Sequence, residues 1–235
     1  MYRFLLAASL LFVPFHVNAE DKPNIMYFLV DNLGIGEISS FAGGPLRGVE
    51  TPRIDDFADE GFRLLNFAPE TQCTPSRSAL MTGRYSIRSG THTVALAGDP
   101  GGLVAWERTI ADILSDEGYA TSIVGKWHIG ASAGRWPTDH GVDEWIGIPH
   151  SYDEALWADD PWYDSNRDPV AYVVESEANG DVKELEQLTD DVKLNIDVEY
   201  LRRSQAFIDR SVPDKTQFCR YSNHSPTPLP AQPRE

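Results

Sequence analysis

Short apolar runs alternate with helical segments along this chain, and this alternation limits the fold more than any other feature. The first run, residues 24–30, is almost entirely apolar and lies between Pro23 and Asp31. A continuous run of this length is typical of a strand buried on both faces, as in parallel sheets. Further runs predict strands at residues 62–67, 119–124 and 216–222.

The segments between these runs have helix signals. Residues 51–61 begin with Thr-Pro, and residues 109–118 begin with Thr; both end in Gly. These are typical N-cap and stop residues. Residues 191–212 have side chains recurring every four positions and predict the longest helix. The acidic residues 159–180 predict a long surface excursion. Strands alternating with helices indicate an α/β fold with a mostly parallel central sheet flanked by helices.

The amino terminus predicts export. Residues 1–19 combine Arg3, an apolar stretch and a small-residue cleavage site ending at Ala19, which is the pattern of a signal peptide. We therefore expect a periplasmic, secreted or lumenal protein, with residues 20–235 as its folded part and no later membrane span.

A formal net charge of −16 makes nucleic acid an unfavourable partner.

Cys73 precedes a predicted helix that runs from Pro75 to Gly83. The amino end of a helix presents free N–H groups and favours an anion, and Arg77 one turn later would add a cation. The residues alone leave two interpretations equally open: a nucleophile at an anion pocket, or a buried cysteine with a surface arginine. A disulfide with Cys219 is a third alternative.

Polar residues follow two of the predicted strands. Asp31 and Asn32 come after the first, and Lys126 and His128 come after the run at residues 119–124. Ligands of open α/β sheets bind at the carboxyl ends of strands, so we expect these residues to meet. In an extended segment Lys126 and His128 would point the same way. The oxygens of Asp31 and Asn32 suit Ca²⁺, or alternatively Mg²⁺.

Two motifs resemble signatures of the sulfatase family. Cys-Thr-Pro-Ser-Arg at residues 73–77 is similar to its C-x-P-x-R motif, and residues 118–128 are similar to its second signature. The opening strand with Asp31 also matches. The resemblance runs from about Pro23 to about Ser151, and more weakly to Tyr221. It implies an alkaline-phosphatase/sulfatase-like fold that is incomplete at the carboxyl end, because family members are far longer.

The resemblance also implies a mechanism. Cys73 would be oxidised to Cα-formylglycine by a maturation enzyme that reads Cys73, Pro75 and Arg77, and the hydrated aldehyde would attack the sulfur of a sulfate ester, a small molecule or a carbohydrate. Arg77 would hold the hydrate, Lys126 would contact sulfate, and His128 would act as an acid/base group. The metal ligands implied are Asp31, Asn32 and residue 73.

Two substrate-binding residues rest on shorter matches. Ser151 is similar to a family serine near the sulfate. His224 lies near the place of a histidine that protonates the leaving oxygen, but Pro228 stands at the expected position. Three hypotheses follow: a sulfuric ester hydrolase of arylsulfatase type, a catalytically inactive remnant, and a phosphate or phosphonate ester hydrolase of the same superfamily.

Overall fold

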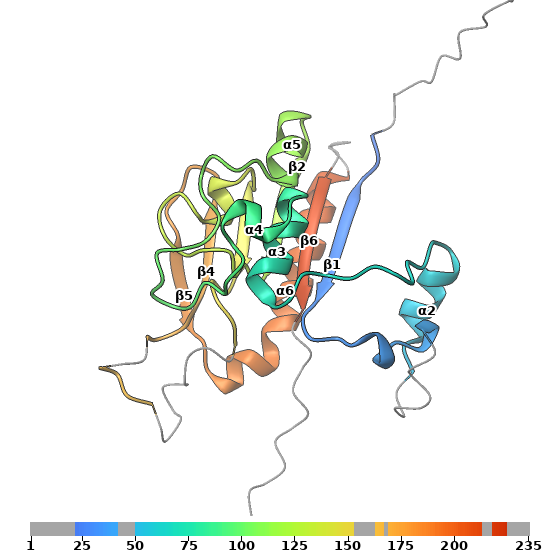
Figure 1. The fold of residues 1–235 in the computed structure, drawn as a ribbon, viewed down its shortest axis with the longest axis horizontal. Helices are drawn as coiled ribbons and strands as arrows, with labels where there is room; N and C mark the ends of the chain where they lie inside the picture. The colour runs from blue at the N-terminus through green and yellow to red at the C-terminus, as the bar shows by residue number, and fades with distance from the viewer. Residues whose placement is uncertain (1–21, 42–49, 153–162, 167–168, 213–217, 225–235) are drawn as a thin grey trace, which may run out of the picture.

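A six-stranded mixed sheet forms the centre of the molecule (Figure 1). The computed structural model describes residues 22–41, 50–152, 163–166, 169–212 and 218–224, the last of these as backbone only. The strand order is β1-β6-β2-β3-β4-β5. The strands are β1 (Ile25–Val30), β2 (Ala120–Gly125), β3 (Glu144–Gly147), β4 (Tyr172–Glu177), β5 (Lys183–Gln187) and β6 (Phe218–His224).

The four strands β1, β6, β2 and β3 run parallel, as the sequence predicts, and β4 and β5 are antiparallel. The prediction of a mostly parallel sheet is therefore right for the first part of the sheet. The antiparallel pair forms a hairpin whose first strand, β4, lies inside the region of residues 159–180 that we expected to be a long surface loop. That expectation is wrong for residues 172–177 because Val173 and Val174 bury their side chains on opposite faces of the sheet.

Helices cover both faces of the central strands. The helices are α2 (Pro52–Asp59), α3 (Cys73–Thr82), α4 (Ser86–Ser89), α5 (Ile110–Asp116) and α6 (Asp190–Ser211), with short 3-10 turns η1 (Ile35–Glu37), η2 (Ser39–Phe41) and η3 (Pro137–Asp139). On one face, Met81 of α3 and Ala111 of α5 share a core with Ile123. On the other face, Tyr200 of α6 packs in a core with Val124. The alternation of side chains along β2 thus separates two helix layers.

The helix caps agree with the sequence in part. Thr109 caps α5, since its hydroxyl accepts a bond of 3.1 Å from the Asp112 amide. Thr51 stands at the N-cap position of α2, but its hydroxyl accepts from the Ser39 amide at 2.9 Å instead of capping the helix. The hydroxyl therefore ties α2 to the preceding loop.

Two predictions about the first strands are wrong. Residues 62–67 form no strand; they are turn and coil, and Phe62 is 98% exposed. An apolar run becomes a strand only where a sheet edge is available to pair with it. Residues 62–67 follow α2 and lie beside it, away from the sheet (Figure 1). The strand β1 is present, but it is not buried on both faces, because Phe28 is 63% exposed. Residues 1–21, with the predicted signal peptide, lie outside the described part of the chain.

Candidate active site

The predicted site residues meet at the carboxyl edge of the parallel strands. Asp31 directly follows β1, Lys126 directly follows β2, and Cys73 is the first residue of α3. We expected Cys73 just before the helix; the helix begins at Cys73 itself, with Gln72 as N-cap. Segments that lie 95 and 53 residues from Lys126 in the chain thus bring a carboxylate and a thiol to its ammonium.

The Lys126 ammonium is the centre of the cluster. It donates to Asp31 Oδ2 at 2.7 Å, to Cys73 Sγ at 3.1 Å and to Ser151 Oγ at 3.0 Å. Its side chain is 3% exposed, so these contacts are made largely out of water. A buried cation needs such partners to offset its desolvation. The structure therefore places Ser151 beside Lys126.

Arg77 provides a second cation. Its guanidinium donates to Asp31 Oδ2 at 3.2 Å and to the Lys126 carbonyl at 2.9 Å. Burial alone would raise the pKa of Asp31, but Lys126 and Arg77 outweigh it and lower the pKa below its usual value. Asp31 is thus an ionised carboxylate between two buried cations, and Arg77 is not the surface arginine that one interpretation of the sequence allowed.

Cys73 is a free cysteine, so the disulfide alternative is not adopted. The neighbouring His128 side chain lowers the pKa of its thiol most, burial acts in the opposite direction, and Lys126 lowers it further. The net shift is downward, which favours a thiolate or another anionic group at this position. The position at the start of α3 adds the positive end of the helix dipole.

The backbone around the site is held in unusual conformations. Three residues other than glycine have positive φ here: Asn32 at 59°, Gln72 at 68° and His128 at 58°. Such residues are uncommon, and they persist where the surroundings fix them. Our expectation of an extended Lys126–His128 segment is wrong at His128. Lys126 nevertheless contacts Cys73 Sγ at 3.1 Å, and His128 lowers the pKa of the same thiol, while Trp127 packs in the core.

Thr74 joins α3 to the Lys126–His128 segment. Its hydroxyl donates to the His128 carbonyl at 2.7 Å and accepts from the Ala95 amide at 3.1 Å, and the side chain is fully buried. The sequence analysis did not select Thr74, although its place beside Cys73 could have suggested it. It also missed His150, whose ring lies edge-on to His128 at 6.1 Å between centroids.

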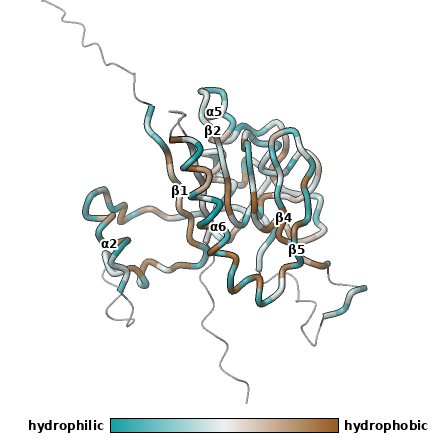
Figure 2. Tube along the Cα trace, turned by 180° about the vertical axis from the view of Figure 1, so that it is seen from behind, coloured by the Kyte–Doolittle hydropathy of each residue, from teal (hydrophilic) through white to brown (hydrophobic). Residues whose placement is uncertain are grey.

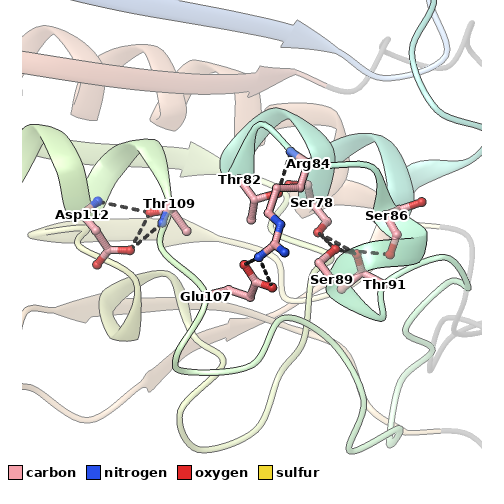
Figure 3. Close-up of polar contacts among 9 residues, drawn as sticks. All are labelled: Ser78, Thr82, Arg84, Ser86, Ser89, Thr91, Glu107, Thr109 and Asp112. Carbon is pink, nitrogen blue, oxygen red and sulfur yellow. Dashed lines mark hydrogen bonds and ion pairs between the residues drawn. The ribbon is translucent and has the colours of Figure 1, made fainter.

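A hydroxyl cluster holds the middle of α3 against the end of α4 and the residues after it (Figure 3). Thr91 donates to Ser78 at 2.6 Å, and Ser89 contacts Thr91 at 2.8 Å. Nearby, Arg84 makes two bonds of 2.9 Å to the buried carboxylate of Glu107. These contacts hold the middle of α3 and the residues after it, while Thr74 holds its first turn.

The described residues fit only part of a calcium site. Asp31 offers an ionised carboxylate and Asn32 an amide, but Asp31 Oδ2 already accepts from two cations. No group of three His, Cys, Asp or Glu side chains suited to a metal occurs in the described part of the chain. Ca²⁺ usually takes six to eight oxygen ligands.

The last predicted site residue lies at the end of β6. The backbone of His224 pairs with Val30, next to Asp31, but its side chain lies outside the described part, as does Pro228.

Within the described residues, no helix combines the length and apolar character needed to cross a membrane.

Comparison with known proteins identifies the family. The sulfatase family model matches residues 23–234, which is most of the chain. The chain belongs to the sulfatase family. Among curated sulfatases, rat arylsulfatase G is 37% identical over 157 residues and bovine arylsulfatase A is 40% identical over 140. These matches cover 65% and 58% of this chain but 29% and 27% of the relatives, so this sulfatase chain spans less than a third of their length.

Solved structures confirm the sulfatase fold. The PsFucS1 sulfatase from Pseudoalteromonas sp. superposes with a TM-score of 0.79 at 28% identity, covering 90% of this chain and 45% of that one. A Bacteroides thetaiotaomicron sulfatase of glycosaminoglycan metabolism superposes with a TM-score of 0.66 at 24% identity, covering 91% and 52%. The fold is therefore alkaline-phosphatase/sulfatase-like, and partial relative to full-length sulfatases.

Proposed function

We propose that this chain is a sulfuric ester hydrolase of arylsulfatase type, whose nucleophile is formed by converting Cys73 to Cα-formylglycine. One observation carries the proposal: the buried Lys126 ammonium contacts Asp31, Cys73 and Ser151 at once. This places a fixed cation next to the nucleophile position. A sulfate ester develops negative charge on its oxygens during cleavage, and a preorganised cation stabilises that charge.

Each residue of the cluster has a proposed task. The hydrated aldehyde at residue 73 would supply the hydroxyl that attacks sulfur. Lys126 would bind a sulfate oxygen and Arg77 would hold the hydroxyl groups at residue 73. His128, which lowers the pKa of the Cys73 thiol, would take and return a proton at that position. Ser151, bonded to Lys126, would orient the ammonium and contact sulfate.

The conversion of Cys73 is expected to precede folding. Pro75 and Arg77, which the maturation enzyme would read with Cys73, are both buried in α3. An enzyme cannot read buried side chains, so the segment has to be accessible before α3 packs. We therefore expect conversion during coexpression with a formylglycine-generating enzyme, and none when that enzyme is added to the folded protein.

Further parts of the proposal rest on the family and on the amino-terminal pattern. Ca²⁺, or Mg²⁺, would bind at Asp31 and Asn32 next to residue 73. The chain would be exported after cleavage of residues 1–19 and would act outside the cytosol. His224 would be the nearest candidate to protonate the leaving oxygen, because its backbone pairs with β1 next to Asp31.

The first experiment tests the nucleophile. The full chain is coexpressed with a formylglycine-generating enzyme, and the tryptic peptide of residues 64–77 is measured by mass spectrometry. We expect the mass of the aldehyde or its hydrate at residue 73. Rates on 4-nitrophenyl sulfate and 4-nitrophenyl phosphate are then compared, with and without Ca²⁺.

The variant Cys73→Ala is the control and should have no sulfatase activity. A converted residue 73 with faster turnover of the sulfate ester supports the proposal. Preference for the phosphate ester would instead assign a phosphoesterase. No turnover of either ester by the converted protein would identify an inactive chain, and an intact thiol after coexpression would contradict the proposed nucleophile.

A further inference from the structure

A cavity of about 320 Å³ opens beside the catalytic cluster. Its walls come from the loop at residues 97–98, from the segment after β3, and from the β4–β5 hairpin with the residues just before it. The side chains that define its character are Ala97, Trp136, Ile148, Val170, Tyr172 and Leu188. This volume lies within the range of small-molecule sites, about 300 to 1,000 Å³.

The cavity is connected to the nucleophile through Ser151. Ser151 lines the cavity and also accepts the Lys126 bond of 3.0 Å, and Lys126 in turn contacts Cys73 Sγ at 3.1 Å. His150, the residue before it, also lines the cavity and faces His128. A molecule that contacts Ser151 in the cavity would therefore lie two hydrogen bonds from residue 73, whose hydroxyl would attack the sulfur of the sulfate ester.

The charge of the walls limits what the cavity can hold. The described residues that line it include no Lys and no Arg, and their one carboxylate is Glu184. A second sulfate or a carboxylate on the substrate would find no cation there and would be repelled by Glu184. The aromatic rings of Trp136 and Tyr172 instead offer surfaces on which a flat, neutral ring can stack.

We infer that this cavity binds the alcohol part of the substrate, and that this part is neutral and apolar, a phenol or a fused aromatic alcohol, not a charged sugar. The inference rests on the proposed sulfatase function and specifies its substrate class. The sulfate would lie at Lys126 and the aromatic ring would extend past Ser151 into the cavity.

The test uses Val170→Glu in the full chain. Val170 is 40% exposed in the loop before β4, so the change adds a carboxylate to the cavity wall with little effect on the core. The matched control is Val198→Glu, because Val198 is 71% exposed on α6 and does not line the cavity. Binding of 1-naphthol is measured by calorimetry, and turnover of 1-naphthyl sulfate is compared with that of a disulfated galactose.

We expect Val170→Glu to weaken 1-naphthol binding about tenfold and to raise KM for 1-naphthyl sulfate by a similar factor, with kcat unchanged. Val198→Glu should change neither. A second variant, Glu184→Lys, should raise kcat/KM for the disulfated galactose. Naphthol binding that is insensitive to Val170→Glu, or a wild-type preference for the disulfated sugar, would overturn the inference.

If the inference about the cavity is wrong, the experimental results differ from those expected if the proposed hydrolase function is wrong. Naphthol binding that Val170→Glu weakens, without hydrolysis of any sulfate ester, would support the cavity's ligand class and contradict the hydrolase. Hydrolysis of 4-nitrophenyl sulfate without any naphthol binding would support the hydrolase and remove the cavity from its substrate site.

Discussion

The part of the molecule that carries the site and the part formed by β1, α2 and residues 62–67 differ in how far their side chains are buried. Around the site, even polar residues are buried: Thr74 is 0%, His128 1% and Lys126 2% exposed. Around β1 and α2, large apolar residues face solvent, with Phe57 79% and Phe62 98% exposed. In Figure 2 the colour of apolar residues runs along β1 and along parts of the chain next to α2.

This difference shows that the two parts depend on different interactions. The strands β2, β3 and β4 have helices or loops on both faces and form two cores. The exposed apolar side chains of β1, α2 and residues 62–67 have no such cover among the described residues, and grouped exposure of this kind marks a contact surface. Asp31 joins the two parts, because it extends from β1 and pairs with Lys126 and Arg77.

The strongest test of this difference in burial removes one aromatic ring from each part and compares the loss of stability. Trp145→Ala deletes a side chain that is 2% exposed, and it should lower the free energy of unfolding by about 3 to 5 kcal/mol. Phe62→Ala should change it by less than about 0.5 kcal/mol. Urea unfolding followed by circular dichroism measures both. A large effect of Phe62→Ala would show that residues 62–67 are packed in solution.

The next largest effect is expected on catalysis. Lys126→Met removes the cation that contacts three site residues, and kcat for 4-nitrophenyl sulfate should fall about 10²- to 10³-fold, the range typical of a lost charge-stabilising donor. Lys22→Met is the control, since Lys22, just before β1, forms an exposed ion pair with Glu117 at the end of α5 and does not contact the site residues. A drop below tenfold for Lys126→Met would mean that Arg77 alone supplies the charge stabilisation.

The same comparison explains what the sequence could predict. The strands β1 and β2 and the helices α5 and α6 have local signals, apolar runs and caps, and they form within two residues of their predicted bounds. The site residues Asp31, Cys73 and Lys126 meet because strand ends share one edge of a parallel sheet. These features depend on local pattern and on a general rule of topology.

The failures concern features that depend on neighbours. The run at residues 62–67 has a strand-like pattern but no sheet edge to pair with. Tyr172–Glu177 becomes a strand because β3 offers an edge, although its acidic surroundings suggest a surface loop. The positive φ of His128 is fixed by the packing around it and has no signature in the sequence. Pairing partners and strain of this kind become visible only in three dimensions.

A smaller effect should follow from loosening the link between α3 and the Lys126–His128 segment. Thr74→Val leaves the buried His128 carbonyl and the Ala95 amide without this partner and should lower the free energy of unfolding by about 1 to 3 kcal/mol. Thr138→Val, which removes a partly buried hydroxyl contact to Ser176 at 3.2 Å, should have a smaller effect. Equal effects in urea unfolding would show that Thr74 is an ordinary buried hydroxyl.

The smallest effect concerns the unconverted thiol and tests the electrostatics of the site directly. Only the thiolate of Cys73 reacts with iodoacetamide. The His128 side chain, with Lys126, lowers the pKa of the thiol against the opposing effect of burial. A lower pKa means that the thiolate persists to lower pH, so the alkylation rate should reach half its maximum below the pH expected for a free cysteine. Lys126→Met should move that midpoint upward, and Lys22→Met should leave it in place. A midpoint unchanged by Lys126→Met would show that His128 alone sets the charge at the nucleophile, and the cation next to it would then act on the substrate and not on residue 73.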